Sequence, residues 1–558
     1  MEILNSESLQ TRLNNSPYVT CEKRSLYPQL QQYIKSPNDG RICCLYGLRR
    51  TGKTVMMEQM MREIGQPDKT LLIQCQSDEP NHQYDTMQQV KNAIYDHPEC
   101  SYIFIDEITK TKNFIGTCSV LADRFAYEGK KIVIAGTDSF GFFLAKNDEL
   151  LDRVHLIHTT YIPFREYNRL LHRGIHDYMR YGGTLTDGYI LYNKDKLHEY
   201  TNSAISLNIV HSLEKWNQGR NFGILEELVN SKRNDLSSFI NKVIEYNNRQ
   251  FLERMINRDF QSHDLGSLVE LLTKHSLVDT TPIDTEEMSD RIRIFLGIKE
   301  NPFNTVDQEC VDTIIQYLKD LDVLYEDPNS VNKKNHEYLF TQIGMRYWQA
   351  TAFAEALVTS DVFDEYNEPE KRMILQKLES DICGGLLEDI VYYQLSKDYN
   401  NHDVKVLKYN NMRGQEVDVL VEDLRTTKSI AFEIKFSDQV SEKSQLKHLL
   451  NDDFCSEIEQ KTGTQIVNKI VLYRGDSLTP QSDALYLNVE DFLINTDEYM
   501  EKLLAMHVPT VEKLKSMTRL DIDFNTVAEQ HKKNKNIAIP NKSKAHQKQI
   551  STENNSNR

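Results

Sequence analysis

The chain has 558 residues, of which 39% are hydrophobic and 27% charged, and its formal net charge is −17. This length predicts three or four domains, and the composition is that of folded globular domains rather than of a disordered chain. The negative charge provides no overall field that attracts nucleic acid, so any such contact needs a local basic patch. The nine cysteines are scattered, without a CxxC pair, which predicts a reduced protein without a structural metal. The start lacks a secretory signal pattern and the chain has no long apolar run, so we expect a cytoplasmic protein without a membrane partner.

The first third of the chain alternates apolar, strand-like runs with helical stretches, which predicts an α/β fold with a parallel sheet. The expected strands are Ile42–Tyr46, Thr70–Gln74, Tyr102–Ile105, Ile132–Ala135 and Val154–His158. From about residue 178 to residue 377 the pattern is mostly helical. Within this stretch, residues 305–347 read as a helix, a short strand and a helix, which resembles a winged-helix module. From residue 381 onward the order helix, strands, helix, strand, strand predicts a separate α+β unit.

These patterns predict five folded segments. They are a parallel-sheet core at 20–175, a helical lid and linker region at 176–300, a winged-helix-like module at 301–350, a helical linker at 351–380 and an α+β domain at 381–500. A polar, lysine-rich tail at 526–558 has few apolar residues and is predicted to be disordered.

The loop after the first expected strand of the core has the sequence GLRRTGKT at 47–54, which matches GxxxxGK[ST]. Backbone N–H groups in such a loop, together with the N-terminus of the following helix, bind phosphate groups. We expect Lys53 to reach the β- and γ-phosphates and Thr54 to bind Mg²⁺. The core is therefore predicted to be a P-loop ATPase with ATP and Mg²⁺ as cofactors. The expected nucleotide-binding residues in the loop are Gly47, Arg50, Thr51, Gly52, Lys53, Thr54 and Val55.

Two acids follow the third expected strand. We expect Asp106 to hold the Mg²⁺ shell and Glu107 to orient or deprotonate the attacking water. Thr137, after the next strand, is a candidate sensor of the γ-phosphate, and a plain polar turn is the alternative. Arg153 and Arg165 are candidates for an arginine that stabilises transition-state charge, and an ordinary ion pair is the alternative for each.

Several motifs occur in a fixed order over about residues 20–210: GLRRTGKT, YIFIDEI, AGTDS, DRV followed by PFREY, and YMRYGG. In this order they resemble the archaeal-ATPase-like branch of the AAA superfamily. That family usually shows a serine-rich sensor segment and a Gly-Arg pair. This sequence has Thr137-Asp138-Ser139 and Asp152-Arg153 at those places.

A second candidate site lies near the C-terminus, in two expected strands at 413–421 and 429–435. If they form a hairpin centred near Arg425, Asp418 lies opposite Glu433 within about one residue, and Lys435 shares the face of Glu433. The sequence at 384–388 is expected to open a helix, with Glu388 beside its buried stripe of Leu387, Val391 and Leu395.

This arrangement suits metal-assisted phosphodiester hydrolysis. Asp418 and Glu433 would bind Mg²⁺, Lys435 would activate water or stabilise the developing charge, and Glu388 would support the metal. The pattern resembles the PD-(D/E)xK restriction-endonuclease-like superfamily, which often accompanies this ATPase branch. One alternative is that these charged residues only form a solvated strand edge. The other is a domain of this fold without nuclease activity, which acts as a binding or structural unit.

The sequence therefore predicts an ATP-hydrolysing protein whose nucleotide state gates a C-terminal nuclease-like domain acting on DNA or RNA. The alternative is an ATP-dependent signalling switch whose middle and C-terminal domains only bind DNA or a protein partner. A DNA translocase is less favoured, because no helicase-type motif accompanies the ATP site. The lysine-rich tail favours nucleic acid, with a solvated, uninvolved tail as the alternative.

Overall fold

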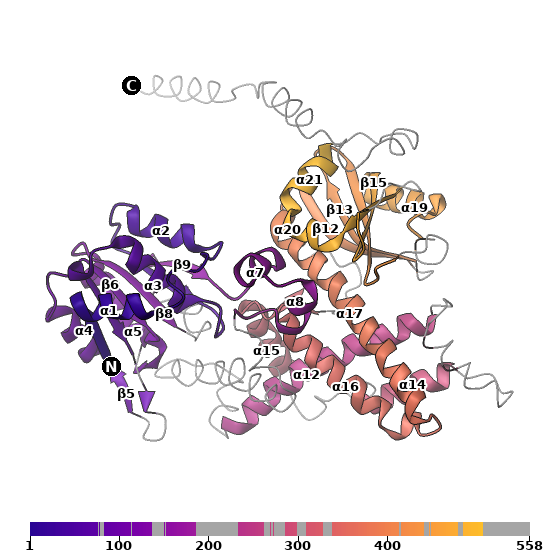
Figure 1. The fold of residues 1–558 in the computed structure, drawn as a ribbon, viewed down its shortest axis with the longest axis horizontal. Helices are drawn as coiled ribbons and strands as arrows, with labels where there is room; N and C mark the ends of the chain where they lie inside the picture. The colour runs from indigo at the N-terminus through magenta and orange to yellow at the C-terminus, as the bar shows by residue number, and fades with distance from the viewer. Residues whose placement is uncertain are drawn as a thin grey trace, which may run out of the picture.

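The computed structural model describes residues 1–75, 77–78, 83–112, 114–136, 150, 152–185, 233–261, 268, 272, 285–297, 308–326, 338–411, 415–439, 446, 448–477 and 484–505. Thr137 and the tail at 526–558 lie outside these residues. Figure 1 shows the N-terminal sheet domain (indigo), the C-terminal sheet (orange to yellow) and long helices, with α7 and α8 between the two sheets. Among the described helices, none combines the length and the apolar character that a membrane span requires.

The N-terminal domain contains a six-stranded sheet in the order β1-β3-β6-β8-β2-β9. Its five parallel strands are β2 (Ile42–Tyr46), β3 (Thr70–Gln74), β6 (Tyr102–Asp106), β8 (Lys131–Gly136) and β9 (Val154–His158). The five strands expected from the sequence are thus confirmed, with ends within one residue. They were recognisable because parallel strands are buried on both faces and read as continuous apolar runs. The antiparallel edge strand β1 (Glu2–Asn5) was not expected.

Helices cover both faces of this sheet, which gives the domain two separate hydrophobic clusters. The helices are α1 (Ser6–Asn15), α2 (Tyr27–Lys35), α3 (Lys53–Ile64), α4 (Met87–Tyr95) and α5 (Phe114–Val120), the last continued by a π-helical turn at Leu121–Ala126. Three short strands form a small separate sheet: β4 (Ser77–Asp78), β5 (Gln83–Thr86) and β7 (Thr111–Lys112).

The middle of the chain is helical. Its elements are α7 (Phe164–Leu171), α8 (Ile175–Tyr181), α12 (Arg233–Gln261), α14 (Thr285–Phe295), α15 (Gln308–Asp320) and α16 (Ile343–Val358). The expected helix, strand and helix at 305–347 are present. An additional strand, β10 (Leu324–Glu326), pairs antiparallel with β11 (Tyr338–Phe340).

A single helix, α17 (Glu368–Tyr399), runs from the helical region into the C-terminal sheet domain (Figure 1). The expectation that Gly384 and Gly385 open a helix is wrong, because both lie inside α17. The helix begins instead after Asn367, whose side chain forms a capping box with Glu370. Gly385 is needed for close packing, since a Cβ there would lie 2.3 Å from the sulfur of Met255 on α12.

The C-terminal sheet has five strands: β12 (Val404–Asn410), β13 (Glu416–Asp423), β14 (Lys428–Lys435), β15 (Gln465–Tyr473) and β16 (Ala484–Asn488). The first three pair antiparallel and the last three parallel. Helices α17, α20 (Val489–Ile494) and α21 (Thr496–Ala505) cover one face, and α19 (Asp452–Thr462) covers the other. One hydrophobic cluster joins the sheet face under α17 to helices α7, α8, α12 and α16. In addition, α17 crosses the expected domain boundary at 380/381. The division of the chain into the domains expected from the sequence therefore stays a prediction.

The expected polar face of the β13–β14 hairpin is only partly present. Leu420 and Ala431, which share the face expected for the charged residues, are buried in the cluster under α19. Between the pairs Leu407–Leu420 and Tyr409–Val417, β13 advances three residues while β12 advances two. This is a β-bulge at Asp418 and Val419, which breaks the strict alternation that the sequence argument assumed. Charged side chains therefore gather only at the end of the strands.

The two glycines in α17 offer a test of the close approach between α17 and α12. A Cβ at Gly384 would meet nothing within 4 Å, whereas one at Gly385 would collide with Met255 and Phe251. Gly384→Ala should stabilise the protein by about 0.5–1 kcal/mol through helix propensity. Gly385→Ala gains the same propensity but overpacks the contact, so it should be less stable than Gly384→Ala by about 1–3 kcal/mol. Urea unfolding of both variants measures this difference, and equal stabilities would contradict it.

Candidate functional site

The P-loop lies at the carboxyl end of strand β2, which is paired with β8 and β9, and directly before α3. Gly47 and Gly52 have positive φ angles of 148° and 86°. A Cβ on Gly47 would lie 2.4 Å from the Thr159 hydroxyl, and one on Gly52 would lie 3.3 Å from the Arg24 side chain. Only glycine fits these positions, which keeps the backbone N–H groups next to the helix N-terminus accessible to an anion.

Lys53 is buried at the first position of α3. Its ammonium group donates hydrogen bonds to the carbonyls of Gly47 (2.9 Å) and Leu48 (2.7 Å). Burial lowers the pKa of Lys53 to about 8, while the carboxylates of Glu107 and Asp106 act in the opposite direction. The side chain thus places a cationic group inside the loop, where it can meet a phosphate.

Asp106 ends β6, which is separated from β2 by β8. The Thr54 hydroxyl donates to Asp106 Oδ2 at 2.9 Å, and burial raises the pKa of Asp106. Hydroxyl and carboxylate oxygens are ligands that Mg²⁺ prefers, and the first turn of α3 contains no acidic residue to repel phosphate. These residues fit an ATP–Mg²⁺ group.

Glu107 follows Asp106 in a left-handed conformation, with φ of 55°. Its Oε2 atom is buried and accepts no hydrogen bond from the residues that the structure describes; the nearest cation is Lys110, at 3.8 Å. A buried carboxylate oxygen without a donor can accept one from water. Glu107 is therefore free to orient a water beside the loop.

The two candidate arginines lie away from this site. Arg153 precedes β9 at the amino end, where its carbonyl accepts from Ile42, and its guanidinium pairs with Asp123 at 2.6 Å. The P-loop is at the opposite end of these parallel strands, so Arg153 does not lie beside this chain's own P-loop, and its role in stabilising transition-state charge stays a prediction. Arg165 pairs with Asp398 on α17 at 2.8 Å and belongs to a domain contact. The expected sensor Thr137 lies outside the described residues.

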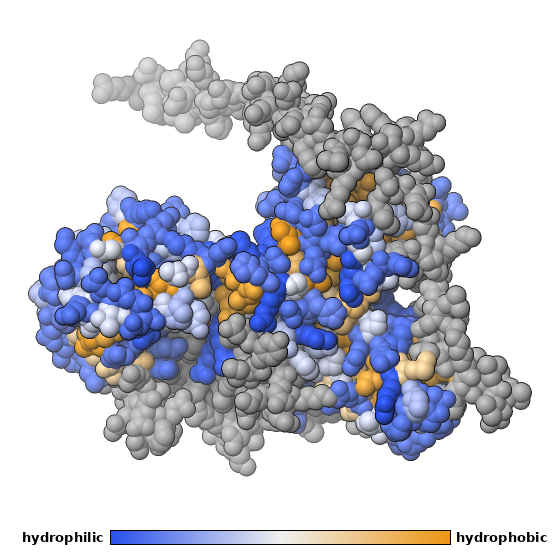
Figure 2. Space-filling model, in the orientation of Figure 1, coloured by the Kyte–Doolittle hydropathy of each residue, from blue (hydrophilic) through white to orange (hydrophobic). Residues whose placement is uncertain are grey.

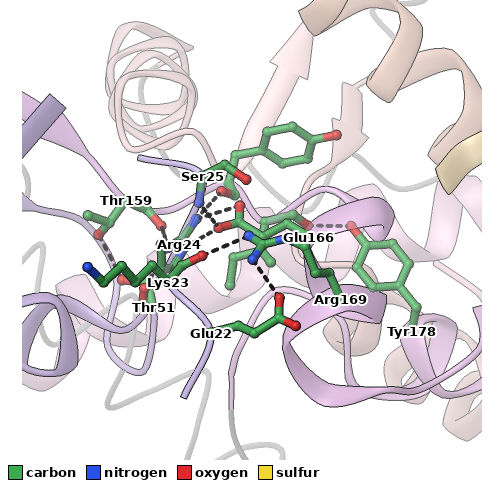
Figure 3. A network of polar contacts seen from close by, with 11 residues as sticks. Glu22, Lys23, Arg24, Ser25, Thr51, Thr159, Glu166, Arg169 and Tyr178 are labelled. Carbon is green, nitrogen blue, oxygen red and sulfur yellow. Dashed lines mark hydrogen bonds and ion pairs between the residues drawn. The ribbon is translucent and has the colours of Figure 1, made fainter. Parts of the chain in front are cut away.

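An arginine that the sequence argument missed lies beside the P-loop. Arg24 is 4% exposed and donates to the Thr51 carbonyl of the loop and to Glu166 on α7 (Figure 3). No signal in the sequence links Arg24 to Glu166, because they are separated by more than 140 positions and Arg24 belongs to no recognised motif; Glu166 lies in the PFREY motif, which does not indicate its partner.

The C-terminal candidate residues come together through Arg258, on α12. Its guanidinium contacts Glu388 at 2.7 Å, Glu416 at 2.5 Å and Asp418 at 3.6 Å. Arg258 was not expected from the sequence, because α12 lies far in the chain from the strands that contain Asp418 and Glu433.

The remaining members of this carboxylate cluster lie on β14. Lys435 pairs with Glu433 at 2.6 Å, and the Ile434 amide donates to Asp418 at 2.7 Å. The ladder of paired residues ends at Val419–Phe432, one residue before the expected Asp418–Glu433 pair. Burial raises the pKa of Asp418, and the neighbouring Glu433 and Glu388 act in the same direction.

This cluster does not fit a metal ion in the present conformation, because Arg258 contacts three of its carboxylates. Nowhere in the described part of the chain do three or more His, Cys, Asp or Glu side chains form a group that can hold a metal.

Two parts of the chain match known families. Residues 39–168 match an AAA domain family, and residues 383–492 match a domain of unknown function (DUF4143). No curated protein matches this chain.

Several solved structures show a low similarity to this chain. The ORC1 protein of Aeropyrum pernix in complex with DNA is 13% identical and covers 62% of this chain and 97% of its own, with a TM-score of 0.23. The ORC2 protein of the same organism is 11% identical over 62% and 98%, with a TM-score of 0.28. AMPPCP-bound DnaA from Aquifex aeolicus is 10% identical over 53% and 86%, with a TM-score of 0.20. Likeness at this level says nothing about what this chain binds.

The family matches agree with the parallel sheet, the GLRRTGKT loop and the Asp106–Glu107 pair. The chain thus carries an N-terminal P-loop ATPase domain of the AAA class and a C-terminal DUF4143 domain on a mixed five-stranded sheet.

Proposed function

We propose that the N-terminal domain binds ATP with Mg²⁺ and hydrolyses it. The observation that carries this proposal is the hydrogen bond from the Thr54 hydroxyl to the Asp106 carboxylate next to the P-loop, beside Glu107, whose Oε2 atom accepts no hydrogen bond from the described residues. Thr54 and Asp106 would hold Mg²⁺, which supplies charge neutralisation for the β- and γ-phosphates. Lys53 balances phosphate charge, and Glu107 orients the attacking water and accepts its proton.

The nucleotide state would reach the C-terminal domain through α7 and α8. Arg165 on α7 pairs with Asp398 at 2.8 Å, and Glu490 of α20 accepts from the first amide of α8 at 3.3 Å. Tyr161, just before α7, packs edge-on against Tyr393 of α17, with ring centroids 4.6 Å apart. Figure 2 shows an apolar patch in this region, as a packed junction requires. A shift of α7 cannot occur without changing these contacts, so the protein would act as a nucleotide-dependent switch.

For the C-terminal domain we favour a role in binding a nucleic acid or a protein partner. The supporting observation is Arg258, whose guanidinium balances the carboxylates that a metal-dependent nuclease would need. Nucleic-acid cleavage is the second candidate. It is favoured by the gathering of Glu388, Asp418, Glu433 and Lys435, the residue types of metal-assisted phosphodiester hydrolysis.

Two substitutions in the nucleotide site should separate binding from hydrolysis. Glu107→Gln should bind ATP as the wild type does and lose most turnover, because an amide cannot act as a base. Lys53→Ala should lose binding as well, because the phosphates lose their main counter-charge. Titration with a fluorescent ATP analogue and a phosphate-release assay measure the two properties. Equal loss of binding and turnover in Glu107→Gln would mean that this residue is structural.

Arg258→Met tests whether the guanidinium balances the carboxylate cluster. Removing one partner of a fully buried ion pair costs about 3–5 kcal/mol. Because Arg258 is 31% exposed, we expect a loss of about 2 kcal/mol in unfolding free energy. Arg249→Met is the comparison variant on α12. Arg249 contacts Glu245 at 4.0 Å, donates to the Leu296 carbonyl at 3.2 Å and lies over the Phe353 ring, but it balances no buried carboxylate, so its loss should be about 1 kcal/mol. Equal losses in urea unfolding would show that Arg258 has no special role.

Incubation with nucleic acid decides between the two candidate functions. We expect pure protein to leave single- and double-stranded DNA and RNA intact in Mg²⁺, with or without ATP, because Arg258 contacts the carboxylates. Mg²⁺-dependent cleavage that is lost in Asp418→Ala would establish the nuclease instead. The control is Asp423→Ala, which removes another buried acid from the same strand and should leave any cleavage unchanged.

A further inference from the structure

Arg24 makes an unusual set of contacts for a residue outside every motif. Its guanidinium donates to three main-chain carbonyls: Thr51 (2.5 Å), Thr159 (2.9 Å) and Tyr161 (3.0 Å). It also donates to both carboxylate oxygens of Glu166, from Nε at 2.8 Å and from Nη2 at 3.2 Å. Figure 3 shows Arg24 between the P-loop and α7, with Glu166 directed toward it. The Arg24 side chain thus contacts the P-loop, the segment after β9 and α7 at the same time.

The contact with Thr51 bears on phosphate binding. A P-loop binds phosphates with backbone N–H groups that point inward, so a loop carbonyl that points away from the phosphates needs a donor elsewhere. A buried carbonyl without a donor is destabilising. Arg24 supplies the donor for Thr51, and the Thr51 hydroxyl in turn donates to the Leu48 carbonyl at 2.9 Å. The stem of Arg24 also packs beside Gly52, next to Lys53.

We propose that Arg24 is a positioning residue for nucleotide binding and turnover, which holds the P-loop in its phosphate-binding shape and is itself held by Glu166. This inference rests on the proposed ATPase function. Neither residue touches the reacting atoms; they act through the Thr51 carbonyl and through the backbone at Gly52.

The chemistry of the pair explains why an arginine stands here. Guanidinium presents five donors in a rigid fork, whereas the ammonium of lysine has three donors on a flexible stem and cannot span the same acceptors. Glu166 also accepts from the Ser25 amide at 2.7 Å, which fixes the backbone on both sides of the ion pair. The preceding residue on α7, Arg165, pairs with Asp398 of α17. A change at the Thr51 carbonyl is therefore passed to α7 and on to α17.

Arg24→Lys and Glu166→Gln are the informative variants, because both keep most of the side-chain volume and break the two-point ion pair between the guanidinium and the carboxylate. Arg169→Lys is the matched control. Arg169 lies on the same helix and contacts Glu22 at 2.9 Å and the Lys23 carbonyl at 2.8 Å, but it is 40% exposed and does not reach the P-loop.

Affinity for a fluorescent ATP analogue, kcat and KM for ATP, and the melting temperature are measured for the wild type, the three single variants and the Arg24→Lys/Glu166→Gln double variant. Misplacing a catalytic geometry by about 1 Å costs on the order of 100-fold, so Arg24→Lys and Glu166→Gln should each lower kcat/KM by about 10- to 100-fold, with at least about a tenfold weaker analogue affinity. The double variant should lose no more than either single variant, because both disrupt one unit. A purely structural role would lower the melting temperature and leave the affinity and kcat of the folded protein unchanged.

Two failures are distinguishable. If the wild type binds the analogue but does not hydrolyse ATP, the proposed ATPase function fails. If Arg24→Lys and Glu166→Gln bind the analogue and turn over as Arg169→Lys does, the positioning role is overturned. If Arg24→Lys does not fold, Glu166→Gln, which keeps the guanidinium and its three carbonyl contacts, gives the same readout.

Discussion

A buried guanidinium must have a carboxylate and a full set of acceptors, and in this protein that requirement connects the nucleotide site to the rest of the chain. Arg24 and Glu166 are 4% and 2% exposed, so either one alone would leave an uncompensated charge in the interior. Their pairing fixes the residues before α2 against α7 and places a donor on the P-loop carbonyl of Thr51. The position of α7 and the shape of the P-loop are therefore not independent.

The same principle organises the C-terminal half. Asp389 of α17 is buried between Arg346 of α16 (2.8 Å) and Lys408 of β12 (3.0 Å). One position earlier, Glu388 meets Arg258 of α12, which reaches the acids of β13. These ion pairs lie within or beside the single hydrophobic cluster that joins the helical region to the C-terminal sheet. A rearrangement of α12 or α16 would leave these carboxylates unbalanced, so the helical region and the sheet are expected to move as one body.

The local parts of this structure were predictable from the sequence, and the long-range parts were not. The five parallel strands follow from continuous apolar runs, and the P-loop follows from a motif whose glycines have a mechanical reason. The gathering of Asp418 and Glu433 follows from a hairpin register that the structure matches through Val419–Phe432. Strand alternation failed at the bulge at Asp418, because a bulge depends on the partner strand β12 and leaves no mark in β13 itself.

Arg24 and Arg258 had no sequence signal, because each pairs with a carboxylate more than 100 positions away. Glu166 lies in the PFREY motif, but the motif does not indicate that its partner is Arg24. The glycines at 384 and 385 were misread for a related reason. Gly385 allows helix α12 to approach α17, and a packing partner distant in the chain cannot be read from a local pattern.

The central claim is that nucleotide at the P-loop changes α7, and hydrogen exchange measures this most directly. Amide exchange is followed with and without a non-hydrolysable ATP analogue and Mg²⁺, in the wild type and in Lys53→Ala. The account predicts that the analogue changes protection in α7 and at the C-terminal end of α17 as well as in the P-loop and α3, and that Lys53→Ala abolishes all of these changes. Protection that changes only in the P-loop and α3, with α7 and α17 unaffected, would contradict it.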